Sequence, residues 1–132
     1  MIITFNNVNF SYSTKEIFNS ASLVINKGEF VFLVGESGIG KTTLLKLIYF
    51  DAKPKSGDVN FDDYSSVNID RSEIPILRRK IGIVFQDFKL LNDRIIFENI
   101  AIPLYIASVR KELIKKKVFD IAAKLGLMEY VN

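Results

Sequence analysis

The residues best suited to chemistry form one glycine-rich stretch. It reads Gly35-Glu36-Ser37-Gly38-Ile39-Gly40-Lys41-Thr42 and matches the pattern G-x-x-x-x-G-K-[ST] of a phosphate-binding loop. Its glycines let successive backbone N–H groups point into one concavity, and a helix starting near Lys41 adds its positive dipole end. Lys41 is then placed to bridge the β- and γ-phosphates, the Thr42 hydroxyl to bind Mg²⁺, and Thr43 to supply one further hydrogen bond.

A glycine-rich turn followed by a chance Lys-Thr pair would show the same letters, but the flanking patterns argue against it. The apolar run 30–34 is β-branched and aromatic and stops at Gly35, which is typical of a strand buried on both faces of a parallel sheet. Residues 42–50 then carry leucines at helical spacing. A strand, a loop and a helix in this order are the context that a phosphate-binding loop requires.

Further elements must hold this loop in place. Alternating apolar residues in 3–10, 17–18 and 23–25 predict two or three antiparallel strands, and 58–61 predicts another short strand. The run 81–85 predicts a second buried strand. Helical spacing predicts helices over 72–80, over 97–107 with an interruption at Pro103, and over 110–125 with Gly126 closing it.

The two outer helices carry more specific expectations. Ser72 is a candidate N-cap for the helix 72–80, and its last residues, Arg78, Arg79 and Lys80, are interpreted as dipole partners on a solvated face. In the helix 110–125, one face should collect Ile114, Val118, Ile121 and Leu125. The cluster 115–117 is most simply a solvated lysine face, with contact to anionic lipid headgroups as the alternative.

Composition excludes several classes of protein. The 132 residues include 18 Lys or Arg against 15 Asp or Glu, and no histidine, cysteine or tryptophan. Disulfide frameworks, thiolate zinc sites and imidazole-based catalysis are therefore absent from this sequence. A net charge of +3 is too small to indicate nucleic acid as the main partner. No apolar run approaches the roughly 20 residues of a membrane-spanning helix, and we expect a cytoplasmic location.

The layout around the loop resembles the ATP-binding subunits of ABC transporters. In that family an aromatic residue upstream of the loop stacks on adenine, and Tyr12 occupies the matching place. The family's Q-loop glutamine, which senses Mg²⁺ and the γ-phosphate, matches Gln86 at the end of 82–86. The resemblance implies ATP and Mg²⁺ as cofactors, with ATP held by Tyr12, the loop through Thr43 and Gln86, and Mg²⁺ by Thr42 and Gln86.

Each of these assignments has an alternative. Tyr12 could simply be half-buried packing at the end of a first strand. Asp87 could be the Mg²⁺-binding carboxylate that follows an apolar strand in phosphate-loop proteins, although in the resembled family that carboxylate follows a later strand. Glu36 and Ile39 are less usual than the small or polar residues often found at those places of the loop, and Glu36 adds a negative charge near the anion site.

The resemblance implies an α/β fold. It would be a P-loop NTPase of the RecA-like type, with a parallel-sheet core, an N-terminal antiparallel β subdomain and the start of a helical subdomain. Residues 1–87 would form the β subdomain and core up to the Q-loop, and 88–132 the start of the helical subdomain. Residues 72–94 and 98–104 are most similar to the cell-division ATPases of the FtsE type, while lipoprotein-release and macrolide-export ATPases share much of the pattern.

Three parts of the resembled ATPases are missing from the sequence: the signature loop, an apolar strand ending in Asp-Glu, and a switch histidine. We therefore expect the chain to be the N-terminal part of a longer ATPase, with no catalytic residue of its own and no hydrolysis when alone. The full-length protein would form a homodimer peripheral to the inner face of the cell membrane. It would bind a polytopic, FtsX-like membrane subunit near residues 86–107.

Two rival functions belong to other classes. One is a nonenzymatic nucleotide-binding or interaction module that is complete as it stands. The other is a small kinase or GTPase, but the guanine-reading Asn-Lys-x-Asp motif of a GTPase does not occur in the sequence.

Overall fold

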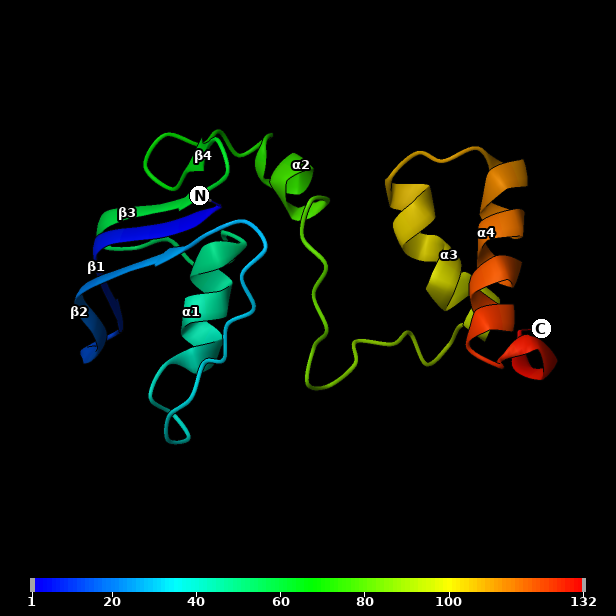
Figure 1. Cartoon of the computed structure of the whole chain (residues 1–132), viewed down its shortest axis with the longest axis horizontal. Coiled ribbons are helices and arrows are strands. Elements are labelled where there is room, and N and C mark those ends of the chain that lie inside the picture. The colour runs from blue at the N-terminus through cyan, green and yellow to red at the C-terminus, as the bar shows by residue number, and fades with distance from the viewer. Residues whose placement is uncertain (1, 132) are drawn as a thin grey trace. The chain divides into compact units, whose positions relative to one another are not determined.

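The computed structural model describes residues 2–131, which divide between Gly82 and Ile83 into two compact units (Figure 1). The sequence analysis expected the boundary between the core and the helical subdomain five residues later, between 87 and 88. The first unit contains β1 (Ile3–Tyr12), β2 (Lys15–Ile25), α1 (Lys41–Ile48), β3 (Ser56–Phe61), β4 (Tyr64–Ser65) and α2 (Ile74–Arg78). The second contains α3 (Ile96–Ile106), α4 (Lys111–Lys124) and the short 3₁₀ helix η1 (Met128–Tyr130).

The strands of the first unit form one antiparallel sheet in the order β2-β1-β3-β4. The alternating pattern of the first 25 residues therefore yields a long hairpin, as expected. The pairing of β1 with β3 shifts register between Asn6 and Asn9, and Asn7 adopts a positive φ of 48° there. Such a shift is a β-bulge, which bends the strand and increases its twist.

Apolar side chains from one face of this sheet form the core of the first unit. Phe5, Val8 and Phe10 of β1 and Val59 of β3 are buried, and Leu47 of α1 is completely buried against them. Burying one such aliphatic side chain contributes about 1.5–3 kcal/mol. Because α1 is fixed to the sheet by this packing, the loop that precedes it has a firm support at its C-terminal end.

The two apolar runs that were expected as buried strands differ from the prediction. Residues 30–34 and 81–85 do not form strands, and the five residues 30–34 are between 45% and 85% exposed. A strand exists only through the ladder it forms with a neighbour. Within the described residues, neither run pairs with a neighbouring strand. High β-propensity is not sufficient without such a neighbour, so both runs are extended connecting segments.

The start of α2 corrects the expected cap at Ser72. The N-cap residue is Glu73, and Pro75 lies in the first turn as expected. Ser72 instead donates both its backbone N–H and its hydroxyl to the Asp70 carboxylate, at 2.8 and 2.6 Å. The serine hydroxyl therefore stabilises the turn that leads into the helix rather than the helix end itself.

These two bonds lower the pKa of the Asp70 carboxyl, with the Ser72 hydroxyl as the larger cause and its N–H as the next. A carboxyl whose folded pKa is depressed stabilises the fold above its unfolded pKa, and that contribution is lost as pH falls through the folded value. We expect the Asp70 carboxyl, followed by NMR, to titrate below an ordinary aspartate. Ser72→Ala should raise that pKa, whereas an unchanged titration would contradict the assignment.

Arg78 was expected to be a solvated dipole partner of its own helix, and it does lie exposed in the last turn of α2, but it has a second role that was not expected. Its Nε donates to the Tyr49 carbonyl and one terminal nitrogen to the Phe50 carbonyl, both at 3.0 Å. These carbonyls lie just after α1, where the last C=O groups of a helix have no intrahelical partner. Arg78 therefore caps the end of another helix, 28 residues away. Lys80 is also partnered, by Asp62 at 3.3 Å.

We expect Arg78→Lys to lower the free energy of unfolding by about 1–2 kcal/mol, because an ammonium cannot reproduce the fork that reaches two carbonyls. Arg79→Lys serves as the control, since Arg79 is exposed and a surface change of this kind stays within about 0.5 kcal/mol. Urea unfolding followed by far-UV circular dichroism measures both, because the sequence has no tryptophan. Equal losses for the two variants would exclude the capping role.

The second unit is a helical hairpin. α3 runs through Pro103 rather than breaking there. α4 ends at Lys124 with Leu125 as its C-cap residue, and Gly126 follows in the left-handed region, as the sequence predicted. Ile114, Val118 and Ala122 of α4 are buried together with Ala101 of α3. Ile121 and Leu125, which the sequence predicted on the same face, are 41% and 64% exposed. No helix among residues 2–131 is both long and apolar enough to cross a membrane.

Candidate phosphate-binding site

The predicted phosphate-binding loop lies between the run 30–34 and α1, at the N-terminal end of that helix. Gly35, Gly38 and Gly40 all have positive φ angles, of 152°, 81° and 116°. Side chains other than glycine rarely adopt such angles, so the three glycines are needed for this loop conformation. The spacing of glycines in the sequence thus corresponds to the places where the backbone turns.

Gly40 is also needed because of what surrounds it. It is the N-cap residue of α1, and a Cβ added to it would lie 2.6 Å from Cγ2 of Ile17 in β2. The loop is therefore held against the antiparallel sheet at the point where the helix begins. No side chain in the described part of the chain caps this end of α1, and the first N–H groups of a helix lack intrahelical partners. These donors, with the positive end of the helix dipole, suit an anion.

Lys41 closes the loop on itself. Its Nζ donates to the carbonyl oxygens of Gly35 and Glu36, both at 2.7 Å, and the Glu36 carbonyl also accepts from the Ile39 N–H at 3.4 Å. The ammonium group therefore lies over the start of the loop, held by neutral carbonyls. It is the cation of the loop, and none of the five ion pairs among the described residues involves it.

The two threonines that follow have different environments. Thr42 is exposed, whereas Thr43 is buried, with 6% of its surface accessible. Of the two hydroxyls, that of Thr42 is therefore on the solvent side of α1 and open to a ligand. Ser37 and Ile39 are also exposed, and the Ile39 Cγ2 lies 3.1 Å from where a Gly35 Cβ would stand.

Tyr12 lies at the end of β1, in the same unit as the loop. Its side chain is 48% exposed and its ring packs edge-on against Phe10, with the centroids 4.9 Å apart. Phe10 is buried in the core. The tyrosine ring is thus supported on one side by the core and leaves about half of its surface to solvent, which suits a stacking surface as well as ordinary packing.

Gln86 belongs to the second unit and is exposed in a turn of 86–87. Its neighbour Asp87 pairs with Lys89, and this hydrogen bond lowers the pKa of the Asp87 carboxyl and raises that of the Lys89 amine. The carboxylate of Asp87, the alternative metal ligand, is therefore already paired with the Lys89 ammonium group. Phe88 and Lys89 both have positive φ angles, of 56° and 52°.

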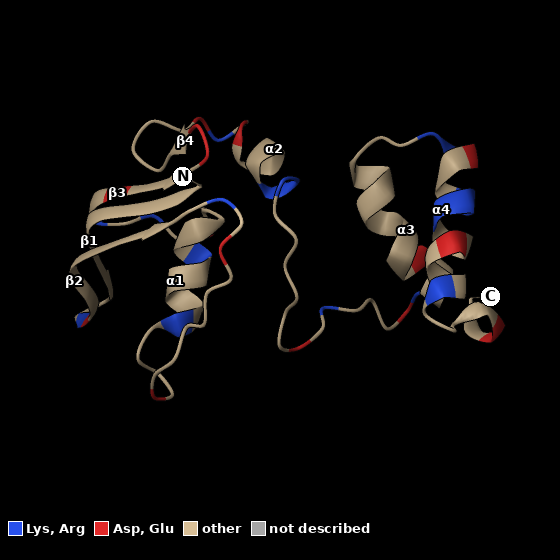
Figure 2. Ribbon diagram, in the orientation of Figure 1, with Lys and Arg blue, Asp and Glu red and all other residues tan. Residues whose placement is uncertain are grey.

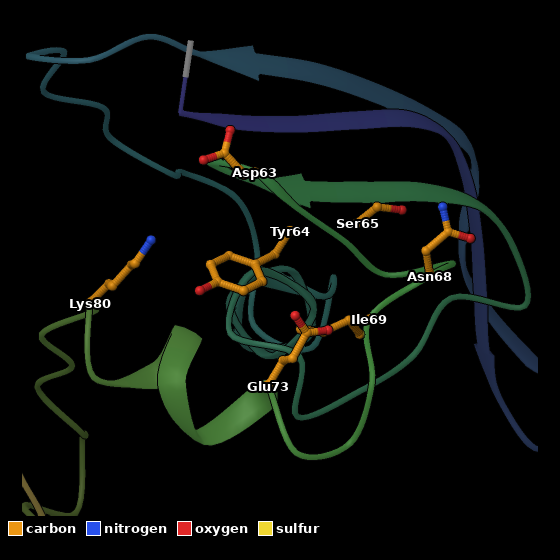
Figure 3. A pocket seen from close by; sticks show the side chains of 7 residues that line it. All are labelled: Asp63, Tyr64, Ser65, Asn68, Ile69, Glu73 and Lys80. Carbon is orange, nitrogen blue, oxygen red and sulfur yellow. The ribbon is translucent and has the colours of Figure 1, made fainter.

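A separate pocket of about 330 Å³ opens beside the hairpin β3–β4. It is lined by Asp63, Tyr64, Ser65, Asn68, Ile69, Glu73 and Lys80 (Figure 3). No residue of the glycine-rich loop lines it. Lys80 lies 4.8 Å from the centre of the Tyr64 ring, and its hydrogen bond to Asp62 raises the pKa of its amine. Lys80, the basic residue among those that line the pocket, is thus already paired with Asp62. The glycine-rich loop is therefore the more favourable site for an anion.

Asp58 and Arg78 are polar residues whose roles the sequence analysis missed. The Asp58 carboxylate accepts hydrogen bonds from the Ser65 and Ser66 hydroxyls, at 2.8–2.9 Å, and the Ser66 hydroxyl also accepts from the Val59 N–H. These bonds hold the hairpin β3–β4 together. The two serines lie seven and eight residues after Asp58, so no short motif in the sequence indicates these bonds.

Comparison with known proteins relates the chain to ATP-binding cassettes. A family model described as ABC transporter matches residues 18–132. The cell division ATP-binding protein FtsE of Bacillus subtilis is 45% identical over 103 residues, covering 78% of this chain and 45% of that protein. A methionine import ATP-binding protein, MetN 2 of Bacillus cereus, is 37% identical over 135 residues, covering 99% of this chain and 40% of that protein.

Among solved structures, a dimeric ATP-binding cassette in a post-hydrolysis state, bound to ADP and phosphate, matches with a TM-score of 0.83. It is 29% identical, and the match covers 99% of this chain and 60% of that one. The chain therefore spans about half the length of the proteins it matches. The α/β fold of the cassette, present here in part, is confirmed by this likeness.

Proposed function

The chain belongs to the ABC transporter ATP-binding family, and on that premise we propose that it binds ATP together with Mg²⁺ through the loop 35–42 and the start of α1. The observation that carries the proposal is the position of Lys41, whose Nζ lies over the loop and, among the described residues, donates hydrogen bonds only to the carbonyls of Gly35 and Glu36. A phosphate group is a stronger acceptor for an ammonium group than a neutral carbonyl.

The residues present fit such a ligand. The loop offers the unpaired N–H donors of the first turn of α1, the Lys41 ammonium and the exposed Thr42 hydroxyl. Lys41 would hold the β- and γ-phosphates and Thr42 would ligate Mg²⁺. Thr43 has a buried side chain, so its further hydrogen bond would come from its backbone N–H in the first turn of α1. Gln86 remains a predicted Mg²⁺ ligand on the strength of the family resemblance.

Tyr12 would hold the adenine base by stacking. We expect Tyr12→Ala to weaken ATP binding about tenfold, because stacking of a base on an aromatic side chain contributes about 1–3 kcal/mol. Affinity for inorganic tripolyphosphate, which has no base, should not change. Calorimetric titration of the full 132-residue chain measures both ligands.

Tyr105→Ala is the control for this prediction, because Tyr105 is 50% exposed and lies in the second unit. It should leave both affinities unchanged. If Tyr12→Ala weakened tripolyphosphate as much as ATP, the tyrosine would act on the fold of the loop rather than on the base.

For the whole protein, we propose ATP hydrolysis that drives a membrane partner, with the 132 residues alone binding nucleotide without turning it over. Water attack on a phosphoryl group needs a group that orients the water and several groups that stabilise charge. The loop supplies only part of this set. Release of phosphate from Mg-ATP by the chain is the measurement, and turnover that depends on Lys41 would refute the proposed inactivity.

The process that hydrolysis serves is proposed to be cell division, because the FtsE relative has the higher identity of the two proteins compared. The full-length protein would act as a homodimer with an FtsX-like membrane subunit that contacts residues 86–107, on the inner face of the cell membrane. Methionine import is the second candidate. Depletion of the gene should give undivided cells, whereas a growth defect cured by methionine would favour import.

A further inference from the structure

We infer that Arg78 of α2 is a positioning residue of the nucleotide site, because it holds the end of α1 that lies opposite to the phosphate-binding loop. This role rests on the proposed function, in which N–H groups of the first turn of α1 bind phosphate. α1 has only eight residues, Lys41–Ile48, which is about two turns. Isolated helices of this length are not stable in water. The geometry of the first turn therefore depends on what holds the last turn.

The C-terminal end of α1 is held by several contacts of one guanidinium group. The Arg78 Nε donates to the Tyr49 carbonyl and a terminal nitrogen to the Phe50 carbonyl, both at 3.0 Å. The same terminal nitrogen lies 3.5 Å from the Asp51 carboxylate, and the guanidinium carbon lies 5.8 Å from the centre of the Tyr49 ring. Basic residues gather at this end of α2 (Figure 2). A cation beside the C-terminal end of a helix also interacts favourably with the helix dipole.

The backbone that follows α1 adopts an unfavourable conformation at Phe50. Its φ is 55°, in the left-handed region that bulky side chains rarely adopt. Such a conformation persists only where the surrounding structure determines it. Two features do so here: the Phe50 side chain is buried in the same core cluster as Leu47 of α1, and the Phe50 carbonyl accepts a hydrogen bond from Arg78. Without Arg78, only the core packing would hold this turn.

The effect of Arg78 reaches the loop through the backbone bonds of α1. At the start of the helix, the Leu44 N–H donates to the Gly40 carbonyl at 2.9 Å, and at its end the Tyr49 N–H donates to the Leu45 carbonyl at 3.2 Å. These two bonds belong to consecutive turns. Because helix formation is cooperative, fraying of the last turn weakens the first. The N–H groups that converge on phosphate then lose their common orientation.

Calorimetric titration of the 132-residue chain with Mg-ATP tests this role. Arg78→Lys keeps the charge but not the fork, and it should weaken ATP binding about three- to tenfold although Arg78 does not touch the ligand. Ser66→Ala is the matched control, because its buried hydroxyl bonds to Asp58 and to the Val59 N–H and so holds the hairpin β3–β4 rather than the end of α1. It should destabilise the fold and leave the ATP affinity unchanged, as should the surface variant Arg79→Lys.

Hydrogen exchange of the Leu44 amide in the ligand-free chain is a second readout. Arg78→Lys should accelerate it more than exchange at the amides of β1, since fraying of α1 is local whereas a general loss of stability affects both. Unchanged ATP affinity in Arg78→Lys, an equal loss in Ser66→Ala, or Leu44 exchange that changes no more than that of β1 would each overturn the role of Arg78 alone. Failure of the parent chain to bind ATP would instead refute the proposed function, and this role with it.

Discussion

Lys41→Ala is expected to weaken ATP binding by about 10- to 100-fold, because a hydrogen bond from a cation to a charged acceptor contributes about 1.5–3 kcal/mol. Lys41 is the only lysine of the loop, and within residues 2–131 its Nζ donates hydrogen bonds only to two carbonyls of that loop. Both carbonyls belong to neutral peptide groups. The ammonium group can therefore exchange them for phosphate oxygens at little cost.

The control for this variant is Lys46→Ala, which removes the same charge from the last turn of the same helix. It should leave the affinity within about twofold. Calorimetric titration with ATP in the presence of Mg²⁺ measures both variants, and urea unfolding shows whether loss of the Gly35 and Glu36 contacts loosens the loop. If both variants bound ATP equally well, the loop would not be the phosphate site.

Local features of the first unit were predictable from the sequence because they depend on neighbours along the chain. Apolar residues in 3–10, 17–18 and 23–25 predicted the antiparallel strands that form the hairpin β1–β2, and glycine spacing predicted a loop with positive φ angles at Gly35, Gly38 and Gly40. The helix after the loop begins at Lys41, one residue from its expected start. Backbone turns and side-chain periodicity carry this information.

Features that depend on distant partners were not predictable in the same way. The fork of Arg78 reaches carbonyls 28 and 29 residues away, and nothing near it in the sequence shows that α1 ends beside α2. The run 30–34 has the composition of a buried strand, but a strand needs a neighbour to pair with. Ile121 lies at helical spacing from Ile114 and Val118, but among the described residues α4 buries Ala122 instead, and Ile121 is 41% exposed.

The residues of the candidate site also differ in whether neighbours in the sequence or distant partners determine their positions. The loop and Thr42 are contiguous in the sequence, so their relation to the start of α1 followed from spacing alone. Tyr12 lies 23 residues before the loop, and only a family resemblance connected it with adenine. The structure adds that its ring is supported by Phe10 and about half exposed, which is compatible with stacking and makes the role testable.

The largest loss of stability is expected for Gly57→Ala, which should lower the free energy of unfolding by about 3 kcal/mol or more. Gly57 lies in β3 opposite the bulge of β1 and has a φ of 80°. A Cβ there would overlap the carbonyl oxygen of Asn7 and lie 2.6 Å from its carbonyl carbon. Both atoms belong to the backbone, so no side chain can move aside to relieve the overlap.

Gly28→Ala distinguishes the two causes of this loss, which are the strain of a positive φ and the overlap of the new Cβ with backbone atoms. Gly28 has a similar φ of 84°, but a Cβ at that position would meet nothing within 4 Å. Its substitution should cost only the strain of a positive φ, about 1 kcal/mol. Urea unfolding followed by circular dichroism should give a much lower midpoint for Gly57→Ala than for Gly28→Ala. Equal midpoints would mean that the backbone angle alone requires glycine at position 57, and that the bulge at Asn7 leaves room for a side chain.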